Sequence, residues 1–167
     1  MKIVVCIKQV PDTTEVKLDP KTGTLIRDGI PSIINPDDKG GLEYALQLKE
    51  EYGAEVTVIT MGPPQAEAVL REAFAMGADR AILLTSRKFA GADTLATSNA
   101  LAGALRVLDF DLILAGRQAI DGDTAQVGPQ IAEHLGIPQV SYLEDLKFDG
   151  NKTFRIKKQL EDGYQIV

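Results

Sequence analysis

Short apolar runs alternate with longer amphipathic segments along the chain. Within the runs nearly every position is apolar, which is typical of β-strands covered on both faces rather than on one. The runs cover Lys2 to Ile7, Glu55 to Thr60, Arg80 to Leu84, Leu112 to Ala115 and, more briefly, Gln139 to Tyr142. This alternation predicts an α/β fold built on a doubly wound, mostly parallel sheet.

The segments between the runs predict helices, and the residues at their ends are common helix starts and stops. We expect helices over about residues 37–52, 64–76, 94–108 and 123–136. Gly53, Gly77 and Gly136 follow three of these segments and favour a C-terminal stop. Asp93 is predicted to cap the third helix, and the fourth is expected to begin near Asp123.

Two further segments interrupt the alternation of strands and helices. Val16 to Gly29 holds a turn sequence at its centre and predicts a β-hairpin insertion off the main sheet. Towards the other end, Leu143 to Phe148 and Thr153 to Leu160 predict a second hairpin. Because the chain stops in another strand-like run, we expect it to be part of a longer protein.

Composition narrows the class of protein. A length of 167 residues suits one domain, 1–167, and 44% hydrophobic residues can fill a core. The sequence has neither a long apolar run nor a signal-peptide pattern, so we expect a cytoplasmic protein without membrane insertion. Cys6 is the only cysteine, which excludes internal disulfides and multi-cysteine metal sites. The net charge of -6 disfavours nucleic acid as a partner.

The segment most suited to bind a ligand lies between the fourth predicted strand and the fourth predicted helix. Ligands of open parallel sheets bind beyond the carboxyl ends of the strands, where a helix N-terminus favours a phosphate. Gly116 and Gly122 would allow close approach of the backbone, and Thr124 and Gln126 would add neutral donors. An ordinary loop, in which Asp121 and Asp123 cap the helix, is an equally good interpretation at this point.

Other predicted strand ends would flank an adenine ring bound there. Cys6 follows the first strand, although a small buried apolar role is the favoured interpretation for it. Met61 follows the second strand and suits core packing and adenine packing equally well. The segment Asn35 to Asp38 could hydrogen-bond a ribose, but on spacing alone helix capping is favoured.

The sequence predicts neither a catalytic set nor a metal site. His134, the only histidine, falls late in a predicted helix, where a C-terminal charge partner is favoured over a catalytic base. Asp121 and Asp123 could hold Mg²⁺ for an ATP-using hydrolase or adenylating enzyme. That hypothesis is disfavoured because the chain lacks both a P-loop and a G-x-G-x-x-G fingerprint.

Four motifs together point to one family. They are VCIKQVPDT at Val5 to Thr13, Asn35-Pro36, AMGADR at Ala75 to Arg80, and GRQAIDGD at Gly116 to Asp123. In these motifs, and over essentially the whole chain, the sequence resembles the beta subunit of electron transfer flavoproteins. The resemblance implies a Rossmann-like fold of the adenine-nucleotide alpha-hydrolase type and an alpha-subunit partner that carries a redox-active FAD.

The resemblance also implies which residues bind the nucleotide. Carried over to matching positions, the contacts are Cys6, Asn35, Pro36, Asp37, Asp38, Met61, Gly116, Arg117, Gln118, Ala119, Ile120, Asp121, Gly122, Asp123, Thr124, Ala125, Gln126 and Val127. Family beta subunits bind a structural AMP or, in electron-bifurcating members, a second FAD that takes electrons from NADH. The form GDTAQVGP at Gly122 to Pro129 is more similar to the bifurcating members, which favours FAD over AMP.

The expected function is therefore that of an electron carrier subunit rather than a stand-alone enzyme. The implied partners are the alpha subunit and an acyl-CoA dehydrogenase or similar flavoenzyme, with NADH as a candidate donor. Family beta subunits continue for roughly another third beyond Val167, with segments for the dehydrogenase and the alpha subunit. Those functions are not assigned to residues of this chain.

Overall fold

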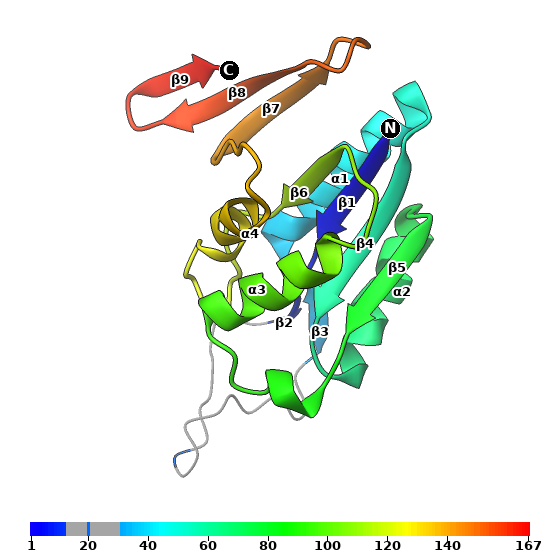
Figure 1. Cartoon of the computed structure of the whole chain (residues 1–167), viewed down its shortest axis with the longest axis vertical. Coiled ribbons are helices and arrows are strands. Elements are labelled where there is room, and N and C mark those ends of the chain that lie inside the picture. The colour runs from blue at the N-terminus through cyan, green and yellow to red at the C-terminus, as the bar shows by residue number, and fades with distance from the viewer. Residues whose placement is uncertain (13–19, 21–30) are drawn as a thin grey trace.

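A four-stranded parallel sheet forms the centre of the molecule (Figure 1). The computed structural model describes residues 1–12, 20 and 31–167. The sheet order is β5-β4-β1-β6, and its strands are β1 (Lys2–Cys6), β4 (Glu55–Met61), β5 (Arg80–Leu84) and β6 (Leu112–Ala115). All three neighbouring pairs are parallel, as the continuous apolar runs predict.

Helices cover both faces of this sheet, because the side chains of each strand point alternately to opposite sides. Ile3 and Val5 of β1 lie in one core cluster, together with residues of α1 (Pro36–Tyr52) and α2 (Glu67–Met76). Val4 and Cys6 lie in the other cluster, with residues of α3 (Thr94–Leu105) and α4 (Val127–Leu135). The doubly wound α/β fold is therefore confirmed.

The predicted helix boundaries agree within three residues for the first three helices and are wrong at the start of the fourth. Asp93 caps α3 as predicted, its side chain accepting a hydrogen bond from the Ala96 backbone at 2.8 Å. Helix α4 begins at Val127 rather than near Asp123. Asp123 and Ala125 have φ values of 50° and 53°, which a right-handed helix does not contain. The start of α4 is thus delayed by a left-handed segment.

The predicted strand at Gln139 to Tyr142 is wrong. These residues instead form an irregular connection from α4 to the next strand, β7 (Leu143–Phe148). Tyr142 has a φ of 57°, which is incompatible with an extended strand, and Pro138 just upstream lacks a backbone donor. The run contains one strongly apolar residue, Val140, which is too weak a preference for a strand to overcome these backbone constraints.

A separate antiparallel sheet follows and contains the predicted hairpin. Its strands are β7, β8 (Phe154–Leu160) and β9 (Gly163–Ile166), in that order. The sheet contacts α1 through two tyrosines: the Tyr44 hydroxyl donates to Glu144 O at 2.9 Å and the Tyr52 hydroxyl to Phe148 O at 3.1 Å. The Tyr52 ring also packs edge-on against Phe148.

The predicted insertion at Val16 to Gly29 lies outside the described residues. On either side of it, β2 (Gln9–Pro11) and β3 (Ser32–Ile34) pair as antiparallel strands. Short 3-10 helices, η1 (Pro64–Ala66) and η2 (Arg87–Phe89), follow β4 and β5. The strand pair β2–β3 thus carries the chain from the end of β1 to the start of α1.

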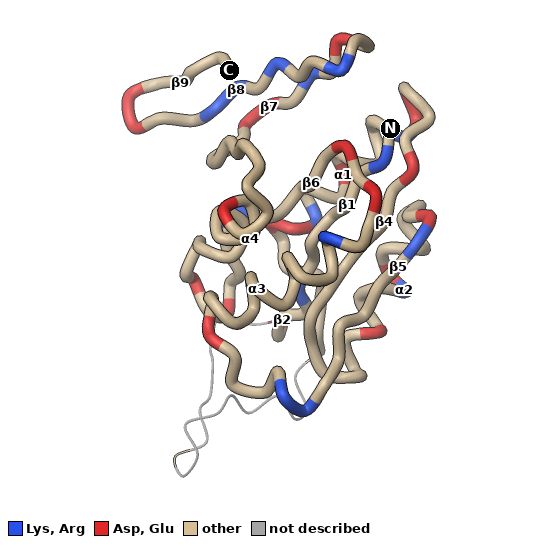
Figure 2. The backbone as a smooth tube through the Cα atoms, viewed as in Figure 1, with Lys and Arg blue, Asp and Glu red and all other residues tan. Residues whose placement is uncertain are grey.

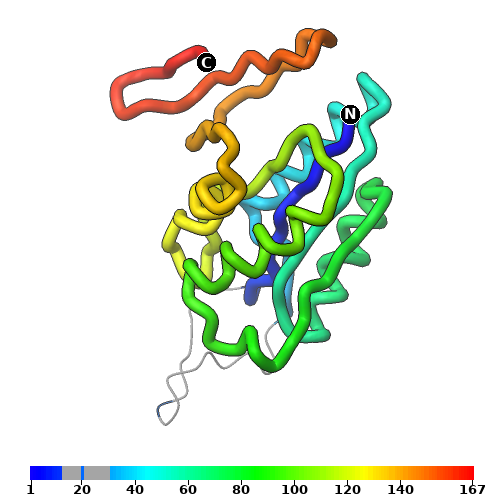
Figure 3. The backbone as a smooth tube through the Cα atoms, in the orientation of Figure 1, coloured from blue at the N-terminus to red at the C-terminus, as the bar shows by residue number. Residues whose placement is uncertain are grey.

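The two ends of the molecule differ in what they hold. Figure 3 shows that both termini lie towards the end that carries β7 to β9, whereas β1 runs from there towards the opposite end. Figure 2 shows few charged residues along the middle of β1, β4 and β6. Because β1 runs away from β7 to β9, the carboxyl ends of the parallel strands form an edge away from the antiparallel sheet.

Among the described residues, no helix is both long and apolar enough to cross a membrane.

Candidate functional site

The residues that the sequence nominated converge on the carboxyl ends of β1, β4 and β6. Cys6 ends β1 and is paired in register with Ile59 of β4 and Ala115 of β6. Met61 ends β4, and the loop from Gly116 to Gln126 leaves β6 at the same edge and leads into α4. The N-terminus of α1, with Pro36 in its first turn, reaches this edge as well.

Asp38 joins three of these elements. Its carboxylate, near the start of α1, accepts hydrogen bonds from Lys8 N at 2.8 Å and from Gly116 N at 3.1 Å. The residue is only 8% exposed, and burial raises its pKa to about 7, against the lowering effect of these hydrogen bonds. Asp38 therefore holds the exits of β1 and β6 against α1 from inside the protein.

Gly116 makes this close approach possible. A Cβ at residue 116 would lie 2.6 Å from Asp38 N and 2.8 Å from the carbonyl carbon of Asp37, both of which are backbone atoms. It would also overlap the Asp38 carboxylate. No flexible side chain can move aside here, so the position needs a residue without a Cβ.

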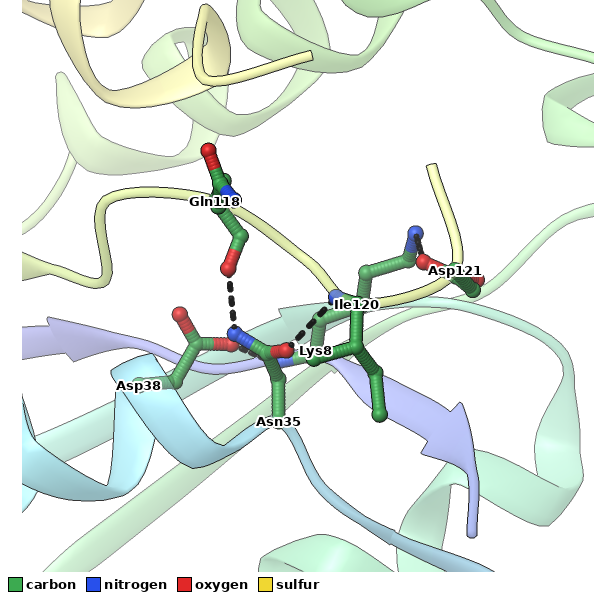
Figure 4. Close-up of polar contacts among 6 residues, drawn as sticks. All are labelled: Lys8, Asn35, Asp38, Gln118, Ile120 and Asp121. Atoms are coloured by element: carbon green, nitrogen blue, oxygen red, sulfur yellow. Dashed lines mark hydrogen bonds and ion pairs between the residues drawn. The ribbon is translucent and has the colours of Figure 1, made fainter. Parts of the chain in front are cut away.

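Asn35 fixes the first part of the loop (Figure 4). Its side-chain amide donates to Gln118 O at 2.8 Å, and its side-chain oxygen accepts from Ile120 N at 3.0 Å. Asn35 occupies the N-cap position of α1, but among the described residues its side chain makes no capping hydrogen bond. The favoured interpretation of Asn35 as a side-chain cap is therefore wrong.

Asp121 is paired with Lys8, which lies in the VCIKQVPDT motif at the end of the first strand but is not among the predicted nucleotide contacts. The Lys8 ammonium lies 2.6 Å from the Asp121 carboxylate, whose side chain is only 5% exposed (Figure 4). The helix N-cap is Gln126, so the interpretation of Asp121 and Asp123 as caps of α4 is also wrong. The charge of Asp121 is balanced within the protein, which lowers its repulsion towards an anion.

Asp37 and Arg117 complete the first half of the loop on its outer side. Asp37 accepts a hydrogen bond from Gln118 N at 3.3 Å and lies 3.8 Å from the Arg117 guanidinium. That guanidinium also lies 6.0 Å from the centre of the Tyr142 ring. Ala119 O accepts from Gly122 N and Asp123 N and closes a turn.

The second half of the loop has a different character. Ala125 is left-handed and Gln126 is right-handed, a combination that directs successive N–H groups to one point and forms an anion-binding nest. The backbone N–H groups of residues 124 to 128 have no hydrogen-bond acceptor within residues 1–12, 20 and 31–167. These groups precede or begin α4, where the helix dipole also favours an anion.

The space beside this nest is open. A Cβ on Gly122 would meet only the Lys8 ammonium, at 3.9 Å, among the described residues. Thr124 is exposed, and Val127, the first residue of α4, packs against the core. An open surface with converging N–H groups and a nearby ammonium matches the chemistry of a phosphate. The residues present therefore fit the diphosphate of a nucleotide.

Helix α3 borders the same edge through Thr94, which sequence reasoning missed. The Thr94 hydroxyl donates to the Gln126 side chain at 3.0 Å and accepts from the Gln130 amide at 3.4 Å. The available signal was its place directly after the N-cap Asp93, at the start of a helix beside the strand ends. Thr94 orients Gln126, whose backbone forms part of the nest.

The structure also places the three remaining candidates, Cys6, Met61 and His134. Cys6 is buried, and burial raises the pKa of its thiol to about 12, so the sulfur is an apolar packing group. Met61 packs partly buried against the same cluster as Cys6. His134 lies in the last turn of α4, with its ring 3.2 Å from the Ser98 hydroxyl. Among the described residues, no three potential metal-ligating side chains gather.

Comparison with known proteins identifies the family. Residues 22–167 match the electron transfer flavoprotein domain. The chain is 66% identical over 167 residues to the electron transfer flavoprotein subunit beta of Clostridium acetobutylicum. It is 61% identical over 169 residues to the caffeyl-CoA reductase-Etf complex subunit CarD of Acetobacterium woodii, and 53% identical over 171 residues to the acryloyl-CoA reductase electron transfer subunit gamma of Anaerotignum propionicum.

Each match covers the whole of this chain and 63 to 64% of the relative. The chain thus spans just under two thirds of the length of these relatives. The predicted resemblance is confirmed by the family match and by identity that extends from end to end of the chain. The chain therefore belongs to the electron transfer flavoprotein family, in its beta-subunit group.

Proposed function

We propose that this chain is the nucleotide-binding part of an electron carrier, and that it holds FAD at the carboxyl ends of β1, β4 and β6. The observation that carries the proposal is the nest at Ala125 and Gln126, which opens beside Gly122 at the N-terminus of α4. When bound, FAD supplies the redox chemistry, and the protein supplies binding, orientation and electrostatics.

The nest would hold the diphosphate. The N–H groups of residues 124 to 127 have no acceptor among the described residues, and Lys8 adds a positive charge without leaving Asp121. The adenine would lie nearer the strand ends, where Met61 and the backbone after Cys6 border the edge. Backbone groups there can recognise the edge of the base without a charged side chain.

The relatives support an electron-carrying role beside a flavoenzyme. Two of them are named as parts of the caffeyl-CoA reductase and acryloyl-CoA reductase systems. We infer that this chain acts with an alpha subunit that carries a further FAD, and with an acyl-CoA dehydrogenase or similar flavoenzyme. We also infer a bifurcating role, in which the FAD held here takes electrons from NADH.

The identity of the nucleotide is tested by counting. The full-length protein is purified with its partner subunit and denatured, and the released nucleotides are separated and quantified by absorbance. Two FAD per heterodimer support the proposal. One FAD and one AMP would make the nucleotide of this chain structural and overturn its redox role. A single FAD with no second nucleotide would overturn the nucleotide site itself.

The location of the site is tested by Gly122→Val. The valine would fill the open space beside the nest while meeting only the Lys8 ammonium among the described residues. We expect the nucleotide content to fall and the apo-protein to keep its stability. Gly103→Val is the matched control, since position 103 of α3 also has open space but lies outside the loop. Unchanged nucleotide content in Gly122→Val would contradict the proposed location.

A further inference from the structure

The side chain of Asn35 is fully buried and both of its polar groups are used. The amide nitrogen donates to Gln118 O and the oxygen accepts from Ile120 N, at 2.8 and 3.0 Å. Asn35 itself is held on both sides: its N–H donates to Lys8 O at 2.9 Å, and its carbonyl accepts from Lys39 N at 3.0 Å. The residue thus links the exit of β1 and the first turn of α1 to the loop after β6.

We propose that Asn35 is a positioning residue for the nucleotide loop and not a ligand of the nucleotide. Its carboxamide sets the path of residues 118 to 120, and this path determines where Gly122 to Gln126 present their N–H groups. The inference rests on the proposed nucleotide site, whose loop it explains. It assigns to Asn35 a role different from the direct contact that the family resemblance implies.

The chemistry of the contact explains why a carboxamide is needed. The two backbone groups of the loop have opposite polarity, one acceptor and one donor, and they are two residues apart. A carboxamide presents one donor and one acceptor at matching positions, as a neighbouring strand would. A carboxylate has two acceptors, so one oxygen would face Gln118 O without a hydrogen atom between them.

The burial of Asn35 argues against a direct contact with a ribose. The residue has 0% exposure, and its side chain already bonds Gln118 O, Ile120 N and the Asp38 carboxylate, so a ligand would have to displace one of these protein partners to reach it. A buried backbone group left without a partner would weaken the loop that offers the phosphate contacts. Asn35 therefore acts on the nucleotide through the loop.

This role predicts a pH-dependent rescue. In Asn35→Asp the protonated carboxylic acid again has one donor and one acceptor, so it can restore both bonds to the loop. Asp37 and Asp38 lie next to the site on α1 and would raise the pKa of the new carboxyl, whereas Lys8, paired with Asp121, would lower it. Because Asp38 titrates in every variant, wild type is measured at each pH.

The experiment measures the dissociation constants of FAD and of AMP for the full-length protein after its nucleotides are removed. At pH 8 we expect Asn35→Ala and Asn35→Asp to bind at least about tenfold more weakly than wild type, because the loop loses its two bonds. At pH 5 the loss relative to wild type should persist in Asn35→Ala and largely disappear in Asn35→Asp. Asn99→Asp, at an exposed position of α3, is the control for the added charge.

Hydrogen exchange of the Ile120 amide gives a second test that needs no nucleotide. In the apo-protein this amide should exchange faster in Asn35→Ala at both pH values, after correction for intrinsic rates. In Asn35→Asp it should be protected again at pH 5. If Asn35→Ala does not fold, exchange of the Ile120 amide in Asn35→Asp at pH 5 and at pH 8 still decides whether Asn35 positions the loop.

The outcomes separate the two proposals. If wild type binds neither FAD nor AMP, the proposed function fails, while exchange at Ile120 still tests whether Asn35 positions the loop. If wild type binds and Asn35→Ala binds equally well, the positioning role is overturned. It is also overturned if the affinity of Asn35→Asp relative to wild type is the same at pH 5 and pH 8.

Discussion

The two halves of the loop between β6 and α4 are built in opposite ways. Residues 116 to 121 are tied to the protein by Asn35, Asp37, Asp38 and Lys8, through bonds to both backbone and side chains. Gly122 borders open space, and the N–H groups of residues 124 to 127 have no acceptor among the described parts of the protein. The first half holds the loop in place, and the second half is available to a ligand.

This difference would explain how a loop of irregular backbone could serve as the proposed binding site. A loop that orders only on binding loses part of the interaction energy to ordering, whereas a preformed loop does not. Here the ordering comes from contacts with Asn35, Asp38 and Lys8 of the protein itself. The same arrangement removes a charge problem, because Lys8 balances the Asp121 carboxylate before an anion arrives.

Gly116→Ala should have the largest effect on stability, since it separates the first half of the loop, residues 116 to 121, from α1. The added Cβ would lie 2.6 Å from Asp38 N, so the helix terminus or the strand exit must move. We expect the free energy of unfolding to fall by about 3 kcal/mol or more, measured by urea denaturation. Gly40→Ala is the control: it lies on α1 with nothing near its Cβ, and should raise stability by about 0.5–1 kcal/mol. Equal stability of wild type and Gly116→Ala would contradict the close approach.

The sequence predicted where the first half of the loop, residues 116 to 121, would lie. It did not predict which residues that half contacts. The continuous apolar runs indicated a parallel sheet, and its strand ends then located the candidate site. GRQAIDGD at Gly116 to Asp123 identified the loop as the segment to examine. The pattern could not show that Asn35 reaches the loop instead of capping its own helix, because both roles suit an asparagine before a helix. Only the placement of Gln118 and Ile120 against it decides between them.

The open half was harder to predict, for a backbone reason. Thr124, Ala125 and Gln126 have no strong preference for a left-handed conformation, so the sequence favoured an earlier helix start. The observed φ of 53° at Ala125 is therefore not recognisable from residue type. The wrong strand at Gln139 to Tyr142 has the same origin, since the left-handed Tyr142 is not recognisable from residue type.

Asp38→Asn should produce an intermediate effect that depends on pH. Burial raises the pKa of Asp38 to about 7 in the folded protein, above its ordinary value of 3.8. Between these values the folded protein keeps a proton that the unfolded chain has released, so wild-type stability falls as pH rises from about 4 to about 7. The slope from this group is at most about 1.4 kcal/mol per pH unit, and Asp38→Asn should lose it.

Urea denaturation at pH 5, 6, 7 and 8 measures this difference. Asp79→Asn is the control, because its hydrogen bond to Lys49 lowers the pKa of Asp79 and moves its titration below this range. The control variant should therefore keep the wild-type slope between pH 5 and pH 7. A wild-type slope retained in Asp38→Asn would show that Asp38 does not titrate there.

Ala125→Gly should have the smallest effect on stability. It bears most directly on the second half of the loop, residues 122 to 127. A left-handed conformation costs an alanine about 1 kcal/mol relative to glycine, so we expect a gain in unfolding free energy of up to about that size. Ala100→Gly, in the right-handed helix α3, should instead lose about 1 kcal/mol. Destabilisation by both substitutions would show that Ala125 is not left-handed in solution.

The nucleotide affinity of Ala125→Gly then decides whether the open half is preformed. If Ala125 is left-handed both with and without a nucleotide, glycine relieves the same strain in both states and the dissociation constant does not change. If the strain arises only on binding, glycine should tighten binding about fivefold, the equivalent of about 1 kcal/mol. We expect an unchanged constant for FAD and for AMP, because Asn35, Asp38 and Lys8 hold the first half of the loop through contacts with the protein itself. A fivefold gain would show that the held half does not order the open half.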